Sequence, residues 1–149
     1  MTDSGSEWAL LRAEWQAALF AQPLSRRALL ALTPVWPCRR ICVRVHRNHP
    51  FEYVTRALAP FLAFARLRAE VDIGDYDDAL TLSLDGDRDV EIVWLDYDRY
   101  HERLALKDLA DWLIERMVVL RSQSDAPILL TDHVGAGEEA TAFNHRLRH

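Results

Sequence analysis

The chain has 149 residues and a mass of 17.2 kDa, which is enough for one domain with its own core. Half of the residues are hydrophobic, and only 5 glycines and 6 prolines are present, which excludes a disordered or low-complexity protein. Two cysteines cannot build a disulfide framework, and Cys38 and Cys42 lack the second ligand pair of a zinc site. Because no apolar run approaches ~20 residues and no signal peptide is recognisable, we expect a cytoplasmic protein without a membrane contact.

The net charge of −5 is unevenly distributed along the chain. Residues 1–70 hold ten arginines and five acids, whereas residues 71–149 hold eight basic and eighteen acidic residues. A nucleic-acid partner requires a persistent basic face, so we expect none.

The N-terminal residues predict two helices. Apolar side chains recur at helical spacing over residues 7–20, and Ser25 is a suitable N-cap for a second helix over 26–32. The first period is carried by Trp8, Leu11, Trp15 and Leu19. We expect residues 1–37 to form a helical extension that either packs on the sheet or forms a homodimer through Trp8 and Trp15.

Residues 38–149 are expected to form a single α/β domain, in which strands alternate with helices. Strands are predicted over 41–46, 70–73, 90–95 and 127–131, and helices over 51–65, 106–120 and 138–149. Pro50 fits the first turn of the first of these helices, whereas Pro60 should kink or split it. Residues 77–84 are compatible with a helical turn or a short strand. The order predicts a three-layer fold with a mainly parallel, flavodoxin-like sheet.

Ligands of open parallel sheets bind just beyond the carboxyl ends of the strands. The first strand is followed there by Arg47, Asn48 and His49, which we take as candidate binding residues. The later strands end in carboxylates and a histidine that suit a metal-assisted phosphoester or ester hydrolase. These alternative catalytic residues are Asp96, Asp98, Asp132 and His133.

Other familiar sites are missing from the sequence. No Gly-x-Gly-x-x-Gly follows the first strand, and no Gly-x-x-x-x-Gly-Lys-Ser/Thr occurs, which excludes those dinucleotide and nucleotide loops. Cys42 lies within a predicted strand, where an inert thiol is the ordinary interpretation. No Ser-His-Asp arrangement can be assembled, so we expect no cofactor and no nucleophilic triad.

The order of several segments resembles a known family. They are the strand 41–46 with Asn48–Glu52, the helical stretch Leu58–Leu62, the stretch Ala69–Asp77, the strand 90–95 and the closing stretch Ala142–Arg148. Together they resemble the N-terminal SGNH-hydrolase-like domain of FkbH-type proteins of polyketide biosynthesis, which carry a further haloacid-dehalogenase-like domain. The resemblance implies an SGNH-like fold that would continue beyond residue 149, so the chain is expected to be truncated at its C-terminus.

The resemblance does not imply hydrolysis, because Arg47-Asn48-His49 stands where SGNH hydrolases carry Gly-Asp-Ser. It implies instead a non-catalytic domain whose partner is an acyl carrier protein or a companion enzyme. Carrier proteins are usually acidic, so docking should use arginines of the first half of the chain. The docking candidates are Arg39, Arg40, Arg44, Arg66 and Arg68.

Overall fold

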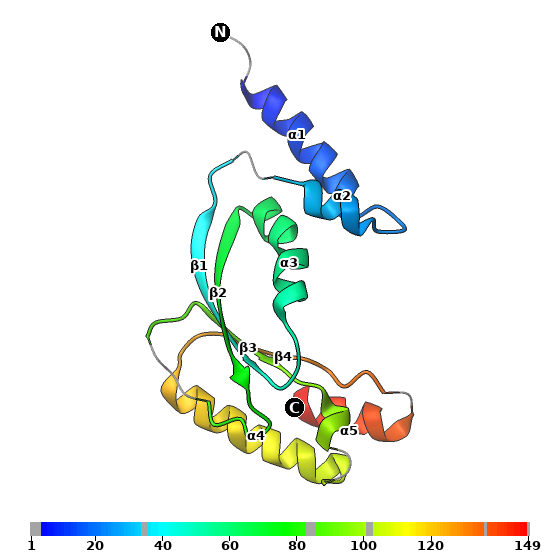
Figure 1. The fold of residues 1–149 in the computed structure, drawn as a ribbon, viewed down its shortest axis with the longest axis vertical. Helices are drawn as coiled ribbons and strands as arrows, with labels where there is room; N and C mark the ends of the chain where they lie inside the picture. The colour runs from blue at the N-terminus through cyan, green and yellow to red at the C-terminus, as the bar shows by residue number, and fades with distance from the viewer. Residues whose placement is uncertain (1–3, 34–35, 83–85, 101–102, 136, 149) are drawn as a thin grey trace. The chain divides into compact units, whose positions relative to one another are not determined.

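The computed structural model describes residues 4–33, 36–82, 86–100, 103–135 and 137–148. The elements in chain order are α1 (Ser4–Leu19), α2 (Arg26–Ala31), β1 (Arg39–Arg47), α3 (Glu52–Phe64), β2 (Leu67–Tyr76), β3 (Val90–Trp94), the 3-10 helix η1 (Tyr97–Tyr100), α4 (Leu106–Gln123), β4 (Ile128–Leu130) and α5 (Glu138–Arg148). Figure 1 labels the helices and strands.

The four strands form one parallel sheet in the order β2-β1-β3-β4. Val43 pairs with Val90 at the start of the β1–β3 ladder, and Arg47 pairs with Trp94 at its end. On the other side of β3, Glu91 pairs with Ile128 of β4. This is the strand order with which a flavodoxin-like sheet begins, and it confirms the expected parallel α/β fold.

Several boundaries differ from those expected. β2 is ten residues long rather than four, and its half-buried and exposed residues alternate over most of its length. Such alternation is typical of an edge strand with one covered face. The alternation begins at Leu67, three residues before the predicted start of the strand at Glu70. α3 continues through Pro60 to Phe64 without being split, and it begins at Glu52, after Pro50.

The undecided segment 77–84 forms neither a helix nor a strand in its described part, residues 77–82. The carboxylate of Asp77 accepts hydrogen bonds from the backbone N–H groups of Ala79 (2.9 Å) and Thr81 (2.7 Å) and from the Thr81 hydroxyl. This local side-chain bonding replaces a backbone ladder and holds the segment as a turn. Residues 83–84 lie outside the described residues.

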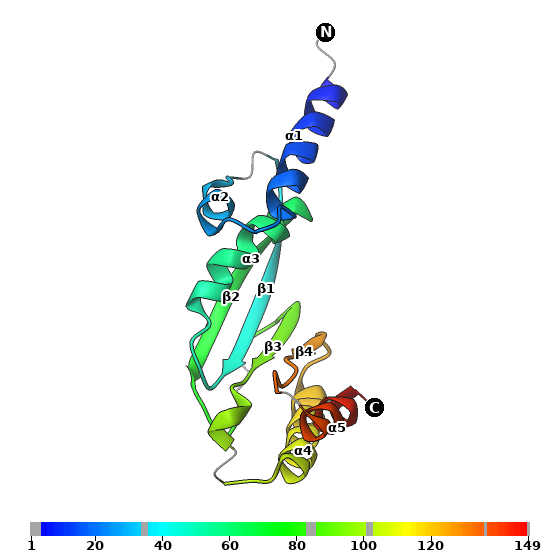
Figure 2. The ribbon, with the colours of Figure 1, turned by 90° about the vertical axis from the view of Figure 1, so that its right-hand side faces the viewer.

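The chain divides into two compact units. The first comprises residues 1–41 and 52–70, in which α1, α2 and α3 pack against one another (Figure 2). Its buried core consists of Trp15, Leu19, Leu29 and Ala63. Ser25 caps α2 as expected, because its hydroxyl accepts a hydrogen bond from the Ala28 N–H (3.3 Å).

Trp15 is only 5% exposed, so it is part of this core and is not available to a partner. Trp8 is 44% exposed. The two tryptophans therefore do not form the exposed stripe on which the dimerisation hypothesis depended, because their spacing serves packing within the unit.

The second unit comprises residues 42–51 and 71–149, and it contains the main hydrophobic core. β3 contributes Val93 to this core, and α4 turns Leu109, Leu113 and Leu120 inward as its period predicted. α4 and α5 lie side by side, in yellow and red in Figure 1. Phe143 of α5 completes the core.

Candidate functional site

The carboxyl ends of β1 and β3 meet in the middle of the sheet, where this strand order usually places a ligand. The residues that follow the two strands all belong to the second unit, so their geometry can be described together. The sequence placed Arg47, Asn48 and His49 on one side of this point and Asp96 and Asp98 on the other.

Asn48 joins the two strand ends. Its side chain is fully buried, and its Oδ1 accepts the Asp96 N–H (2.7 Å) while its Nδ2 donates to the Asp96 carbonyl (3.1 Å). The Asn48 carbonyl in turn accepts a hydrogen bond from Arg99 Nη1 (2.9 Å). Asn48 is therefore a clamp between β1 and β3, and its amide is already occupied.

Arg47 and His49 are also held by their neighbours. Arg47 is 9% exposed, its Nε donates to the Gly74 carbonyl (2.7 Å), and its guanidinium lies 4.2 Å from the centroid of the Tyr76 ring. His49 stacks on Trp94 with ring centroids 5.1 Å apart, and burial lowers its pKa, which favours the neutral imidazole near pH 7. All three candidate binding residues contact neighbouring groups at the strand ends, Asn48 and Arg47 through hydrogen bonds and His49 through ring stacking.

The two aspartates after β3 shape the start of η1. The Asp96 carboxylate accepts the Asp98 N–H (3.1 Å), which is a turn-forming contact. Tyr97 and Tyr100 of the same helix are buried, and burial raises the pKa of each phenol to about 12. Both phenols therefore stay protonated at neutral pH and cannot act as bases there.

Asp132 and His133, which follow β4, are tied to α5. Asp132 forms an ion pair with Arg148. The amide of Asn144 makes two hydrogen bonds with the backbone of His133: the His133 N–H donates to Asn144 Oδ1 (2.8 Å), and Asn144 Nδ2 donates to the His133 carbonyl (3.0 Å). The His133 ring packs edge-on against Phe143. Within the described residues, no group of three or more His, Cys, Asp or Glu side chains is arranged to hold a metal ion.

A buried pair, His46 and Glu91, joins β1 to β3, and Ser124 at the end of α4 extends it to a polar triad that the sequence interpretation missed. His46 Nε2 and Glu91 Oε2 are 2.9 Å apart, and the Ser124 hydroxyl donates to the other carboxylate oxygen of Glu91 (3.2 Å). Glu91 is fully buried, and burial lowers the pKa of His46 although the Glu91 carboxylate opposes the shift. The sequence contains a signal for this pair, since Glu91 is a carboxylate inside the apolar strand 90–95. A buried acid needs a hydrogen-bond partner, so the position of Glu91 predicts a polar neighbour. The histidine does not contact the hydroxyl, so the triad is not a nucleophile–base pair.

A polar cavity of about 270 Å³ lies beside β1 and the end of β2. Arg44 and Arg47 line it, but so do Asp75 and Asp77, which balances their charge. Arg44 is further neutralised by Asp72 (2.5 Å). Among the described lining residues, the two arginines and the two aspartates therefore carry opposite charges in equal number.

The five arginines that the sequence analysis proposed for docking a partner differ in their exposure to solvent. Arg44 has a side chain only 19% exposed and turned to Asp72, which removes it from a docking surface. Arg40 is exposed but forms an ion pair with Glu70. Arg39 is exposed on β1, and its N–H donates to the Arg66 carbonyl (2.8 Å). Arg66 and Arg68 are exposed as well.

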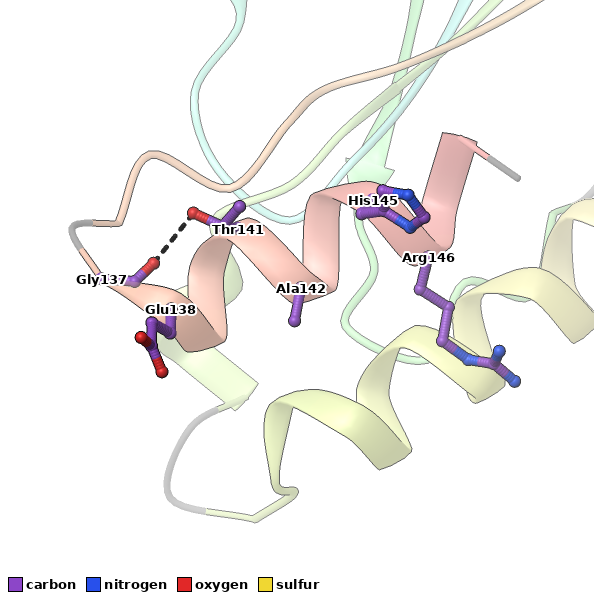
Figure 3. A pocket seen from close by; sticks show the side chains of 6 residues that line it. All are labelled: Gly137, Glu138, Thr141, Ala142, His145 and Arg146. Atoms are coloured by element: carbon purple, nitrogen blue, oxygen red, sulfur yellow. Dashed lines mark hydrogen bonds between the residues drawn. The ribbon is translucent and has the colours of Figure 1, made fainter.

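A hollow with a volume of about 970 Å³ lies along one side of α5. Figure 3 shows its described lining residues on this helix and the turn before it: Gly137, Glu138, Thr141, Ala142, His145 and Arg146. Glu138 and His145 lie at opposite ends of the helix in this view and do not approach one another. Arg146 forms an ion pair with Asp111 of α4 (2.5 Å). Among the described residues that line the hollow, no acid and base therefore lie together where they could act on one substrate.

Comparisons with family models, with curated proteins and with solved structures found no match. In the part of the chain that the structure describes, no helix combines the length and apolar character required to cross a membrane.

Proposed function

We propose that this chain is a non-catalytic, SGNH-like domain of the cytoplasm that recognises a partner protein in polyketide-type biosynthesis. The implied partner is an acyl carrier protein or a companion enzyme. The observation that carries the proposal is the Asn48–Asp96 clamp, which bonds the two strand ends to one another at the point where this sheet type usually holds a ligand.

The side chains around the clamp support the same interpretation. Arg47 bonds to a backbone carbonyl and His49 stacks on an indole. A hydrolase would need Asp132 and His133 at the neighbouring strand end, but the Asp132 carboxylate pairs with Arg148 of α5 and the His133 ring packs against Phe143 of the same helix. A catalytic centre needs at least one reactive group directed at substrate, whereas these groups are directed at other parts of the protein.

Charge supports an acidic partner for the first unit. Residues 1–41 and 52–70 contain eight arginines against five acids, a net charge of +3, while the second unit is strongly acidic. Complementary charge increases the rate and the specificity of association and makes both sensitive to salt.

The test is calorimetric titration of the full chain with apo and acylated acyl carrier proteins, at low and at high salt. We expect binding that weakens as salt rises. Absence of binding to carrier proteins, or binding that salt leaves unchanged, would refute carrier recognition by charge.

A parallel assay examines the hydrolase alternative. The chain is incubated with p-nitrophenyl phosphate and p-nitrophenyl acetate, with and without Mg²⁺. Metal-dependent turnover that Asp96→Asn abolishes would replace the proposal with a catalytic function.

A further inference from the structure

The outward face of α2 combines positive charge with exposed apolar surface. A shallow hollow of about 590 Å³ is lined there by Arg26, Arg27, Leu30 and Ala31. Residues four apart in a helix are neighbours, so Arg26 lies beside Leu30 and Arg27 beside Ala31. Leu29, on the other side of the helix, is buried in the core of the first unit and determines which face is outward. We call Arg26, Arg27, Leu30 and Ala31 the α2 face.

The charge of the α2 face is not neutralised within the described part of the chain. Neither Arg26 nor Arg27 has a carboxylate within ion-pair distance among the described residues, in contrast to Arg40, which pairs with Glu70. The Arg26 guanidinium lies 5.8 Å from the centroid of the Tyr53 ring, which is 69% exposed. A guanidinium over an aromatic ring retains its charge and its outer N–H groups for a second partner.

Apolar surface surrounds these two charges. Leu30 is 48% exposed and Tyr53 is 69% exposed. Large apolar side chains left in water next to unneutralised arginines are typical of a protein contact. The combination fits a segment that presents carboxylates on both sides of an apolar residue.

We propose that the α2 face binds an acidic amphipathic helix of the partner, with its carboxylates on Arg26 and Arg27 and an apolar side chain over Leu30 and Tyr53. The guanidinium group forms bidentate hydrogen bonds with carboxylates, and an apolar hollow between two such groups accommodates an aliphatic side chain. This inference rests on the proposed function and assigns the contact to α2 rather than to the arginines of β1 or to Arg66 and Arg68.

The test compares two charge-reversed variants with the same change in net charge. Arg26→Glu/Arg27→Glu alters the α2 face, and Arg66→Glu/Arg68→Glu alters two exposed arginines outside it. The probes are an apo acyl carrier protein and a fluorescein-labelled helical peptide of glutamate and leucine, with a scrambled peptide as control. Affinity is measured by fluorescence anisotropy, and circular dichroism with thermal unfolding establishes that each variant is folded.

We expect the α2 variant to bind both probes about tenfold more weakly or worse, and the Arg66/Arg68 variant to change binding less than about twofold, because rim charges away from a contact contribute little. Leu30→Ser, an uncharged change at an exposed site, should also weaken binding of both probes. Weaker binding of the amphipathic peptide than of its scrambled control would contradict the proposal.

The failures of the two hypotheses are distinguishable. If wild-type protein binds carrier protein and the α2 variant binds it equally well, the α2 assignment is wrong and the proposed function stands. If carrier protein does not bind but the peptide does, with the expected loss in the α2 variant, the α2 face stands and the carrier assignment fails. Equal losses in the two double variants indicate attraction to overall charge and overturn the α2 face. The α2 face is also overturned if the wild-type protein sediments with anionic phosphatidylglycerol vesicles, the α2 variant does not, and the helical peptide does not compete with the vesicles for the protein.

Discussion

Replacing Asn48 by alanine tests whether the clamp between β1 and β3 is structural. The substitution removes two side-chain hydrogen bonds, to the N–H and the carbonyl of Asp96, from a site with no solvent exposure. Each bond contributes about 1 kcal/mol, and a buried peptide group left without a partner costs about 1 kcal/mol more, so we expect a loss of about 2–3 kcal/mol. For a domain of this size, that corresponds to a decrease in Tm of about 5–10 °C.

Asn144 provides a matched control for this measurement. Its amide makes the same pair of bonds, to the N–H and the carbonyl of His133, but it is only half-buried, so water can replace the lost groups. Asn144→Ala should therefore cost about 1 kcal/mol. Urea unfolding followed by tryptophan fluorescence gives both values. If Asn48→Ala costs no more than Asn144→Ala, Asn48 is not a clamp and is again a candidate for ligand contact.

Three further changes test the remaining structure. Burial lowers the pKa of His46 below 6.5, so the unfolded chain binds a proton at a higher pH than the folded protein does. The free energy of unfolding should therefore fall as the pH drops from 6.5 towards the folded pKa. His46→Gln should flatten this pH dependence in urea titrations, and an unchanged slope would contradict the reasoning. Glu91→Ala removes the hydrogen-bond partner of His46 and Ser124 and should lower the free energy of unfolding by at least about 2 kcal/mol. Glu91→Gln can still form a hydrogen bond with both residues, so it should lower the free energy of unfolding by less. The reverse order in urea unfolding would be incompatible with the triad. Arg66 has a left-handed backbone conformation with φ of 58°, which is strained for any residue except glycine, so Arg66→Gly should stabilise the fold by about 0.5–1 kcal/mol. Arg68→Gly, within strand β2, should destabilise the fold. A decrease in Tm for both variants would show that the backbone of Arg66 is not strained.

Local patterns in the sequence predicted the order of the strands and long helices, but not η1 or the full length of β2. The run 90–95 is almost continuously apolar and forms the central strand β3, and the 3.6-residue period of α4 correctly placed Leu109 and Leu113 in the core. The extent of β2 was underestimated, because its outward face carries charged residues and only every second position is apolar. Segment 77–82 could not be decided, because side-chain hydrogen bonds of Asp77 determine its conformation, and these do not appear as a hydrophobic period.

Candidate site residues were harder to predict than elements. The sequence placed Arg47, Asn48 and Asp96 at neighbouring strand ends, which the structure confirms. It gave no indication that these groups would bond to one another or to the backbone, because a polar residue after a strand is compatible with a ligand, a turn or a clamp. Glu91 went unnoticed for the opposite reason, since a single acid hardly alters the apolar character of its strand.

By itself, the sequence determined the alternation of strands and helices, the inward faces of the long helices and the uneven charge of the two halves, because each depends on the order of side chains within a few turns or along one segment. The tertiary structure alone decided which polar groups are satisfied internally and which arginines remain without carboxylate partners. The physical reason is that hydrogen bonds and ion pairs act over about 3 Å and join residues up to several dozen positions apart in the chain, so their partners are known only when the strands are adjacent.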